Sequence, residues 1–377
     1  MKILITDIHH GNGGGHVTYV LSLLKGLKGQ HDLTVLVPPT GRLYAAAART
    51  GVRTLPGLYT SRPLPLFKEV RQLRRFLLQE RFDVIHVNGG ADHRHVMLAS
   101  LGMRHRPAIV WTKHNTNPVS SFGHRLRARF GTQASIAVCE YVARLLDSSG
   151  YGRRSMCLVR LGIDHDYFQP VEPIQKQTFR QQLLGSLAND VLVLGSTGGT
   201  DYNKGWLDLV HAASRLKPEL RRRVRIVVAG APPSATMRAK VASFNMQDQV
   251  VFPGLLADVR IVLGASDIGF VLSYQEAASY ACCESMSMGL PTLVSNVGGL
   301  PENVRDGQDG RVVPAGNIDA LIDVLHDMLA YPQSLPVMGR SARDRIQQVF
   351  CETAFIENTQ AVYRQAYCVA RNKPAPI

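Results

Sequence analysis

Residues 1–27, MKILITDIHHGNGGGHVTYVLSLLKGL, contain the pattern from which the rest of the chain is built. The apolar run at 2–5 is short and predicts a buried strand. A glycine-rich stretch follows it, and apolar residues then recur at helical spacing, at positions 17, 20, 21, 24 and 27. The segment therefore predicts a strand, a tight turn and a helix.

The same alternation continues along the chain. Further apolar runs that predict buried parallel strands lie at 33–37, 84–87, 109–111 and 136–138, and then at 191–195, 224–229, 250–252, 268–272 and 292–295. Helical patterns separate these runs, which is typical of a parallel α/β sheet. The two series predict two doubly wound, Rossmann-like domains. Ligands in such sheets bind beyond the carboxyl ends of the strands, so two facing domains would define a cleft.

The expected boundaries follow from these two series. We expect an N-terminal domain over 1–165 and a second domain over 166–350, with the linker near 164–175. The last segment, 351–377, carries apolar residues at helical spacing. We predict that it forms a helix that packs back toward the N-terminal domain.

Composition excludes several classes of protein. Of the 377 residues, 45% are hydrophobic and 19% are charged, which fits a globular protein with a full core rather than a disordered chain. No apolar run is long enough for a signal peptide or a spanning helix. The six cysteines show no CxxC pair, so we expect reduced thiols in a cytoplasmic protein.

The net charge of +14 is unevenly distributed. Residues 1–164 hold 23 Lys and Arg against 9 Asp and Glu, whereas the rest of the chain holds 20 of each. A basic half of this kind favours an anionic partner, which could be nucleic acid, a membrane surface or a phosphorylated substrate. With 7% aromatic residues and no recognition motif, nucleic acid is not expected.

A basic amphipathic helix is predicted at 66–77. Its apolar face would comprise Phe67, Val70, Leu73, Phe76 and Leu77, with Lys68, Arg71 and Arg75 opposite. One interpretation is a helix docked on its sheet with a solvated basic face. The other is reversible attraction to anionic lipid.

Two motifs could bind ligands. Gly11-Asn-Gly-Gly-Gly15-His16 opens the first helix, where glycines permit close approach of a ligand and the helix N-terminus favours an anion. It is not a dinucleotide fingerprint, because His16 stands where the last glycine belongs, so a simple tight turn is the alternative. Glu276 and Glu284, with seven residues between them, would each bind a hydroxyl pair of one extended ligand, or would be two solvated helix carboxylates.

The second motif also carries a resemblance to a known family. Glu276-x7-Glu284, followed by Gly289-x-Pro291 and 298-GGLPE-302, resembles the donor-binding segment of retaining GT-B glycosyltransferases of family four, the glycosyl transferases group 1. Supporting matches along the chain are 83-DVIH-86, 113-KHN-115, 138-VCE-140, 161-LGID-164 and 203-NKG-205. Bacterial lipopolysaccharide-core sugar transferases are members of this kind.

The resemblance implies roles for individual residues. Glu284 would bind the nucleotide ribose, Glu276 the transferred sugar and Lys204 the leaving diphosphate, while His114 would line the reaction centre. Catalysis would rest on His114, Glu276 and Lys204, through positioning and charge stabilisation without metal or cofactor. Further donor-binding positions would be Gly14, Gly15, Gly254, Ser279, Tyr280 and Ala281, and the acceptor would contact His16. Independently of the resemblance, Asp92 follows a strand end, where it would contact an acceptor hydroxyl.

The chain departs from the family pattern at two points. Gly199 stands where the family usually has an arginine that completes a cationic clamp with the lysine, and 229-AGAP-232 replaces the usual Gly-Asp-Gly. These changes leave open a transferase that has lost activity.

The expected activity is transfer of a sugar, with retention, from a nucleotide-sugar, most simply a UDP-sugar. The acceptor would be an anionic glycan or glycolipid of the lipopolysaccharide core or another cell-surface polysaccharide. We expect cytoplasmic location, with peripheral contact to the anionic inner-membrane surface. The alternatives are a GT-B-like sugar-nucleotide epimerase and a nucleic-acid-binding protein that uses the basic half.

Overall fold

A computed structural model describes residues 1–11, 14–153, 155–185 and 191–371. The chain packs as two compact units, Met1–Gly162 with Glu352–Ile377 (unit 1) and Ile163–Cys351 (unit 2). These divisions lie close to the predicted boundaries at 165 and 350. The C-terminal helix forms part of unit 1.

Unit 1 contains a seven-stranded sheet of parallel strands in the order β3-β2-β1-β4-β5-β6-β7. Strand β1 lies at its centre, where Ile3 pairs with Leu33 on one side and Val84 on the other. The strands are β1 (Lys2–Thr6), β2 (Asp32–Val37), β3 (Arg53–Pro56), β4 (Val84–Val87), β5 (Ala108–Lys113), β6 (Ala134–Ala137) and β7 (Ser155–Leu158).

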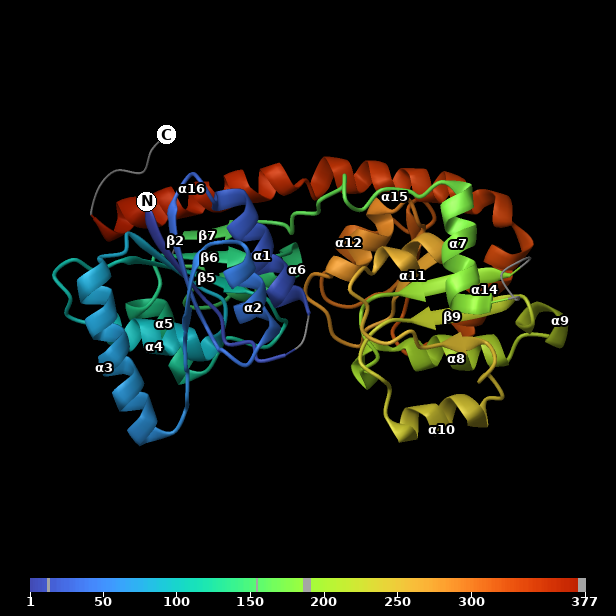
Figure 1. Ribbon diagram of the computed structural model, residues 1–377, viewed down its shortest axis with the longest axis horizontal. Helices are drawn as coiled ribbons and strands as arrows, with labels where there is room; N and C mark the ends of the chain where they lie inside the picture. The colour runs from blue at the N-terminus through green and yellow to red at the C-terminus, as the bar shows by residue number, and fades with distance from the viewer. Residues whose placement is uncertain (12–13, 154, 186–190, 372–377) are drawn as a thin grey trace. The chain divides into compact units, whose positions relative to one another are not determined.

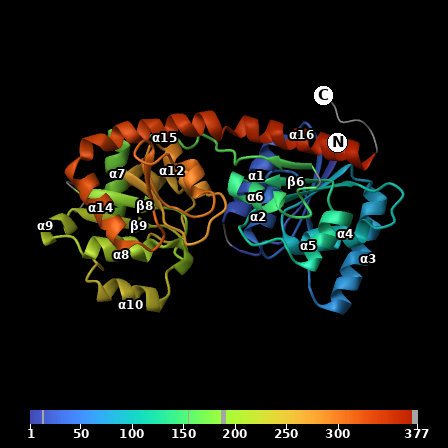
Figure 2. The ribbon, with the colours of Figure 1, turned by 180° about the vertical axis from the view of Figure 1, so that it is seen from behind.

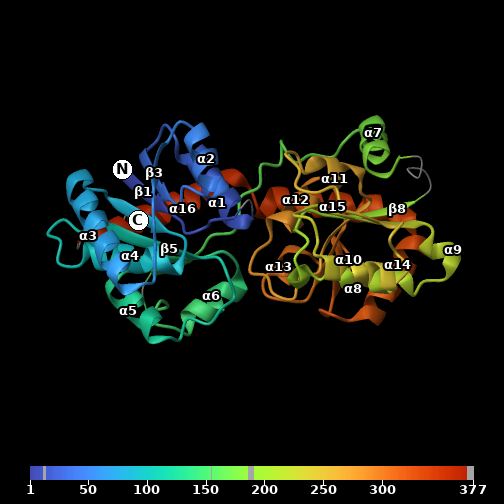
Figure 3. The ribbon, with the colours of Figure 1, turned by 60° about the horizontal axis from the view of Figure 1, so that its bottom comes forward.

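Helices cover both faces of this sheet. Figure 3 shows α1, α2 and α16 gathered over one face and α4 and α5 over the other, and Figure 2 shows α3 beside α4. The helices are α1 (Gly15–Leu27), α2 (Arg42–Arg49), α3 (Pro63–Glu80), α4 (Gly90–Ser100), α5 (Phe122–Phe130), α6 (Glu140–Asp147) and α16 (Glu352–Ala370). A sheet covered on both faces requires apolar residues along the whole strand, as the sequence of β1 shows.

Unit 2 repeats this plan with a six-stranded parallel sheet in the order β10-β9-β8-β11-β12-β13 (Figure 1). Its strands are β8 (Leu192–Ser196), β9 (Val224–Val228), β10 (Val250–Val251), β11 (Ile268–Val271), β12 (Thr292–Ser295) and β13 (Gly310–Val313). The helices are α7 (Pro173–Leu184), α8 (Trp206–Ser214), α9 (Pro218–Arg221), α10 (Ala235–Ser243), α11 (Arg260–Ala265), α12 (Tyr280–Ser287), α13 (Leu300–Asn303), α14 (Ile318–Ala330) and α15 (Leu335–Val349), with short 3-10 turns η2 (Tyr202–Lys204) and η3 (Pro332–Ser334).

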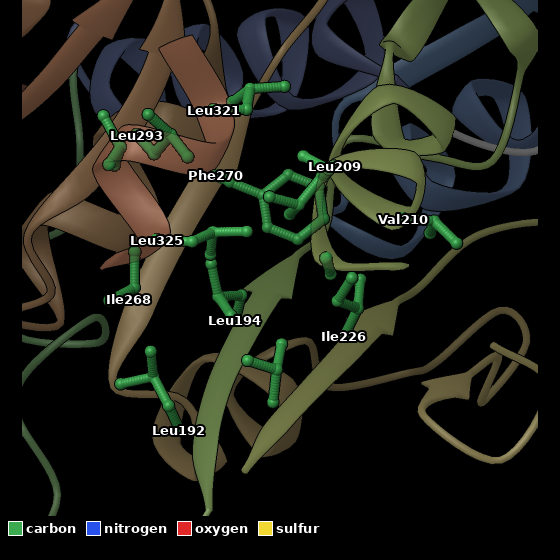
Figure 4. Close-up of a cluster of buried hydrophobic side chains, with 14 of the residues drawn as sticks. Leu192, Leu194, Leu209, Val210, Ile226, Ile268, Phe270, Leu293, Leu321 and Leu325 are labelled. Atoms are coloured by element: carbon green, nitrogen blue, oxygen red, sulfur yellow. The ribbon is translucent and has the colours of Figure 1, made fainter. Parts of the chain in front are cut away.

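The main core of unit 2 lies between its sheet and helices α8 and α14. In Figure 4, Leu194, Ile226 and Phe270 of the strands meet Leu209 of α8 and Leu325 of α14. All five side chains are buried. Burying apolar side chains of this size contributes about 1.5–3 kcal/mol each, so this layer fixes the sheet from which the loops of the site extend.

The prediction of two Rossmann-like parallel sheets is confirmed, but three strands were missed: β3, β7 and β13. All three are edge strands, and the sequence of β3 (RTLP) and of β7 (SMCL) is at most half-buried. An edge strand needs fewer apolar residues than a central one, so it carries a weaker signal.

The predicted apolar face of α3 was wrong at Phe67. Leu73 and Leu77 are buried, but Phe67 is 71% exposed and so shares the outer side of the helix with the basic residues. The helix packs through a narrower stripe than the sequence predicted.

Helix α16 is joined to the unit 1 sheet by a buried hydrogen-bond chain. The Tyr363 hydroxyl lies 2.6 Å from Nδ1 of His86, and Nε2 of the same imidazole lies 2.6 Å from the Thr112 hydroxyl. Burial lowers the pKa of His86 to about 3, so this imidazole stays neutral and needs both partners. The C-terminal segment is therefore a structural part of unit 1.

Replacing Tyr363 with Phe is expected to lower the free energy of unfolding by about 1–3 kcal/mol, because a buried ring nitrogen of His86 loses its partner. Chemical denaturation followed by circular dichroism measures this. Tyr367→Phe, on the same helix but only half-buried, is the control and should change little. Equal stability of the two variants would show that these hydrogen bonds do not hold α16 on the sheet.

Candidate functional site

Each sheet has one switch point, a position between two neighbouring strands at which the strand order reverses. Strands that come earlier in the chain are added on one side of this point, and later strands are added on the other side. In unit 2 this point lies between β8 and β11, and in unit 1 between β1 and β4. Loops that follow strands on the two sides of such a point diverge and leave a crevice at the carboxyl edge of the sheet, which is where doubly wound proteins bind ligands. The predicted site residues are concentrated at these two points.

At the unit 2 point, two loops bring a lysine to a carboxylate. Lys204 ends the 3-10 turn after β8, and Glu276 lies in the loop after β11; Nζ and Oε2 are 3.0 Å apart. The Tyr274 amide donates a hydrogen bond to the Asn203 carbonyl at 2.9 Å and so ties the two loops together. Both charged side chains are partly exposed, so a ligand can reach them.

Gly205 explains why the lysine loop can lie so close to β11. Its φ of 66° is in the left-handed region, and a Cβ there would lie 1.9 Å from the Leu272 carbonyl oxygen. Only glycine fits this contact. The close approach sets the distance between Lys204 and Glu276.

Glu284 lies on α12, whose first turn is capped by Ser279 through a hydrogen bond from the Cys282 amide. The one hydrogen bond that the structure shows to the Glu284 carboxylate is long, at 3.5 Å from the Thr197 hydroxyl. Burial raises the pKa of Glu284 to about 7, and the Thr197 bond only partly offsets this. The carboxylate therefore retains acceptor capacity for ligand hydroxyls.

The other predicted donor positions are distributed around this site. Ala281 faces the loop after β8: a Cβ added to Gly198 in that loop would lie 3.9 Å from the Cβ of Ala281. The Gly254 carbonyl accepts a hydrogen bond from the Gly230 amide at 3.1 Å, and Tyr280, the first residue of α12, is buried. Gly199 has φ of 96°, and the position that its Cβ would take is open space.

Unit 1 carries a second polar cluster at its own switch point, centred on His114. Nε2 of His114 donates to Asn88 Oδ1 at 2.9 Å. The side-chain nitrogen of Asn88, Nδ2, donates to the Thr6 carbonyl and so fixes the orientation of the side-chain amide. Burial, with the nearby His16, lowers the pKa of His114 well below its usual value. The imidazole is therefore neutral, and Nδ1 is left as an acceptor for a hydroxyl.

His16 lies directly beside His114, with ring centroids 4.3 Å apart. Its Nδ1 is 3.0 Å from a carboxylate oxygen of Asp7, which is fully buried. Burial lowers the pKa of His16, but the hydrogen bond and the charge of Asp7 outweigh it, so the pKa is raised overall. A histidine held in this way can present positive charge to an anionic ligand.

Asp92 was predicted to contact an acceptor hydroxyl, and the geometry gives it another role. It is fully buried, and its carboxylate accepts hydrogen bonds from the Thr6 hydroxyl and from the amides of Asn88, Gly89 and His93. Burial raises its pKa to about 7. Asp92 shapes the turn after β4 and leaves no face for a ligand.

Of the N-terminal glycines, Gly15 begins α1 and Gly14 precedes it with φ of 108°. Residues 12 and 13 of the same motif lie outside the described residues. Three residues that orient site side chains were not predicted from the sequence: Asp7, Asn88 and Thr197. Their signal was positional: each closely follows a strand at a switch point.

The described residues contain no cluster of three or more His, Cys, Asp or Glu side chains that could hold a metal ion. Among these residues there is also no helix with the length and apolarity to cross a membrane. The buried histidines bond within the protein, as His93 does to the Gly131 carbonyl.

A cavity of about 660 Å³ lies elsewhere in unit 2. It is lined by Leu192, Asp267 and Pro291, which stand at or before the starts of β8, β11 and β12. It therefore opens at the amino edge of the sheet and is separate from the site around Lys204.

Two Rossmann-like parallel sheets, each with polar side chains at its carboxyl edge, are the architecture that the sequence resemblance predicts. Family models agree: "Glycosyltransferase Family 4" matches residues 13–167 and "Glycosyl transferases group 1" matches residues 179–345. The chain belongs to this family of GT-B glycosyltransferases.

Three known proteins illustrate the similarity. A GDP-mannose-dependent phosphatidylinositol monomannoside mannosyltransferase of Mycolicibacterium smegmatis is 27% identical, over 90% of this chain and 92% of that protein. The structure of Anabaena HepE with UDP and glucose has a TM-score of 0.81 at 18% identity, covering 96% of this chain and 98% of HepE. WaaG, a glycosyltransferase involved in lipopolysaccharide biosynthesis, has a TM-score of 0.72 at 14% identity, covering 96% and 99%.

The raised pKa of Glu284 predicts pH-dependent nucleotide binding. The ionised carboxylate is the better acceptor for ribose hydroxyls, and with a pKa of about 7 its ionised fraction rises about tenfold between pH 6 and pH 8. Affinity for a nucleotide-sugar should rise by up to that factor, as measured by calorimetry. Glu284→Gln is the control for titration of other groups. The prediction fails if this variant shows the same pH dependence as the wild type.

Proposed function

We propose that this protein is a retaining glycosyltransferase that moves a sugar from a UDP-sugar to an anionic glycan or glycolipid acceptor. The observation that carries the proposal is the arrangement in unit 2, where Lys204 and Glu276 meet at the switch point and Glu284 stands on the following helix. These three groups suit the diphosphate, the sugar and the ribose of a nucleotide-sugar, respectively.

The donor would occupy the site by exchanging one partner for another. Lys204 would leave the Glu276 carboxylate and pair with the diphosphate, which frees Glu276 to accept hydrogen bonds from sugar hydroxyls. Glu284 would accept from the ribose. Charge-assisted hydrogen bonds of this kind contribute about 1.5–3 kcal/mol each, so each residue should matter measurably.

In the reaction, the bond between the anomeric carbon and the diphosphate oxygen breaks, and the acceptor oxygen bonds to that carbon. For retention, the acceptor attacks from the face that the diphosphate leaves, and its proton passes to the leaving phosphate. The protein then contributes positioning and charge stabilisation. His114 is neutral and would accept a hydrogen bond through Nδ1. We propose no metal or cofactor.

Charge supports an anionic acceptor. The whole net charge of +14 falls within residues 1–164, and the partly exposed His16 is paired with the buried carboxylate of Asp7, which raises the pKa of the imidazole. We propose that unit 1 binds the acceptor at the cytoplasmic face of the inner membrane, in synthesis of the lipopolysaccharide core or another cell-surface polysaccharide. WaaG, which shares the fold, is involved in lipopolysaccharide biosynthesis.

The donor nucleotide can be identified by titrating the protein with UDP, GDP and ADP in a calorimeter. We expect UDP to bind best, since HepE binds UDP, whereas a GDP preference would match the mannosyltransferase relative. Lys204→Ala should weaken binding of the preferred nucleotide about tenfold to a hundredfold. Lys217→Ala, a change of the same kind on an exposed lysine of unit 2, is the control. Binding of none of the three would favour a transferase disabled at Gly199.

The acceptor proposal predicts that activity depends on charge. With the preferred donor, transfer to a phosphorylated core glycan should exceed transfer to its dephosphorylated form at low salt, and the difference should shrink as ionic strength rises. The measurement is the initial rate for the two acceptors from about 0.02 to 0.5 M salt. Equal rates at low salt would contradict an anionic acceptor.

A further inference from the structure

Unit 1 contains an apolar pocket away from the cluster around His114. It has a volume of about 330 Å³ and lies between the ends of β2 and β3 and the helix α3. Its walls are formed by Leu36, Leu55, Leu58, Tyr59, Leu73 and Phe76, with Gln72, Glu69 and His95 among the polar residues. The volume is in the range of pockets that bind small molecules.

The polar groups of this wall are mostly engaged within the protein. The Tyr59 hydroxyl donates to the Leu36 carbonyl at 2.7 Å. Glu69 accepts from the Thr60 amide and from Nε2 of His95, both at 2.9 Å. A ligand in this pocket would therefore make apolar contacts rather than hydrogen bonds, as a hydrocarbon chain does.

The outer side of the same helix has the composition of a membrane-facing surface. Leu64 is 86% exposed, Phe67 71% and Leu78 49%. Lys68, Arg71 and Arg75 are exposed as well, and these six positions follow one another at spacings of one, three or four residues, so they form one stripe of α3. Exposed apolar groups interleaved with cations are typical of helices that lie in the interface of an anionic bilayer.

The stripe borders the pocket. Gln72, which lines the pocket, lies four residues after Lys68 and three before Arg75, so these side chains are neighbours on the surface of α3. Leu58, which is 59% exposed, also belongs to the pocket wall. Cations therefore stand beside an apolar cavity at a surface that carries exposed apolar side chains.

We propose that this pocket binds one acyl chain of an anionic membrane lipid, whose phosphate is held by Lys68, Arg71 and Arg75. The charge of the stripe selects an anionic head and the pocket selects a hydrocarbon chain. The site is distinct from the donor site of unit 2. It deepens the membrane contact that the proposed function includes, but it does not require transferase activity.

Photo-crosslinking tests where the acyl chain of the lipid lies. The probe is 1-oleoyl-lysophosphatidylglycerol with a diazirine near the end of the chain, used with the full-length protein below the micelle concentration. We expect crosslinks in the peptides that contain residues 55–59 and 72–76. Crosslinks confined to residues 64–67, or scattered over the protein, would overturn the proposal, because the chain would then lie on the surface alone.

Matched variants test the pocket and the head site separately. Gln72→Trp, which fills the pocket from the helix side, should weaken binding of the oleoyl lysolipid at least fivefold. Gln79→Trp, also on an exposed position of α3 but outside the pocket wall, should not. Arg75→Glu should weaken binding at least threefold, while Arg49→Glu on α2 serves as its charge control.

Ligand controls complete the test. Glycerol phosphate, which has the head and no chain, and monoolein, which has the chain and no charge, should each bind at least tenfold more weakly than the lysolipid. Equal binding of Gln72→Trp and wild type, or of glycerol phosphate and the lysolipid, would overturn the proposal. UDP binding by the same preparations is measured in parallel. Absence of lysolipid binding by the wild-type protein, with its UDP binding intact, would refute this inference without affecting the donor site.

Discussion

The parallel direction of the strands is the constraint on which both units depend. Because all strands of a sheet end at the same edge, every loop that follows a strand reaches that edge, and the two loops at a switch point diverge there. The Lys204 loop and the Glu276 loop lie on the two sides of such a point. Their 3.0 Å ion pair follows from the topology, although 72 residues separate the two side chains.

The buried carboxylates of the two polar clusters differ in the number of hydrogen bonds that they accept. In unit 2, the structure shows one hydrogen bond to the carboxylate of Glu284, a long one, and burial raises the pKa of this group to about 7. In unit 1, Asp7 is paired with His16, and Asp92 accepts four hydrogen bonds. A buried acid with a single long hydrogen bond can accept further hydrogen bonds from ligand hydroxyls, whereas an acid with several hydrogen bonds holds neighbouring groups in place.

Much of the fold and the position of the site could be predicted from the sequence, because central strands and glycine turns have strong local sequence patterns. Edge strands such as β3 do not, since half-buried positions need no apolar run. The motif resemblance assigned Lys204, Glu276 and Glu284 individual roles, but only the fold shows that the first two form an ion pair. Phe67 was misjudged because spacing along a helix does not show how much of a side chain its neighbours cover, and Asp92 because a position after a strand does not show whether the side chain is buried.

The central claim is that the donor binds at the unit 2 switch point and replaces Glu276 as the partner of Lys204. A crystal structure of the protein with UDP tests it most directly. We expect the ribose hydroxyls on Glu284, the diphosphate on Lys204, and a Lys204–Glu276 separation well beyond the 3.0 Å of the present structure. UDP bound elsewhere, for example in the cavity at the amino edge, or an ion pair left intact beside bound UDP, would contradict the account.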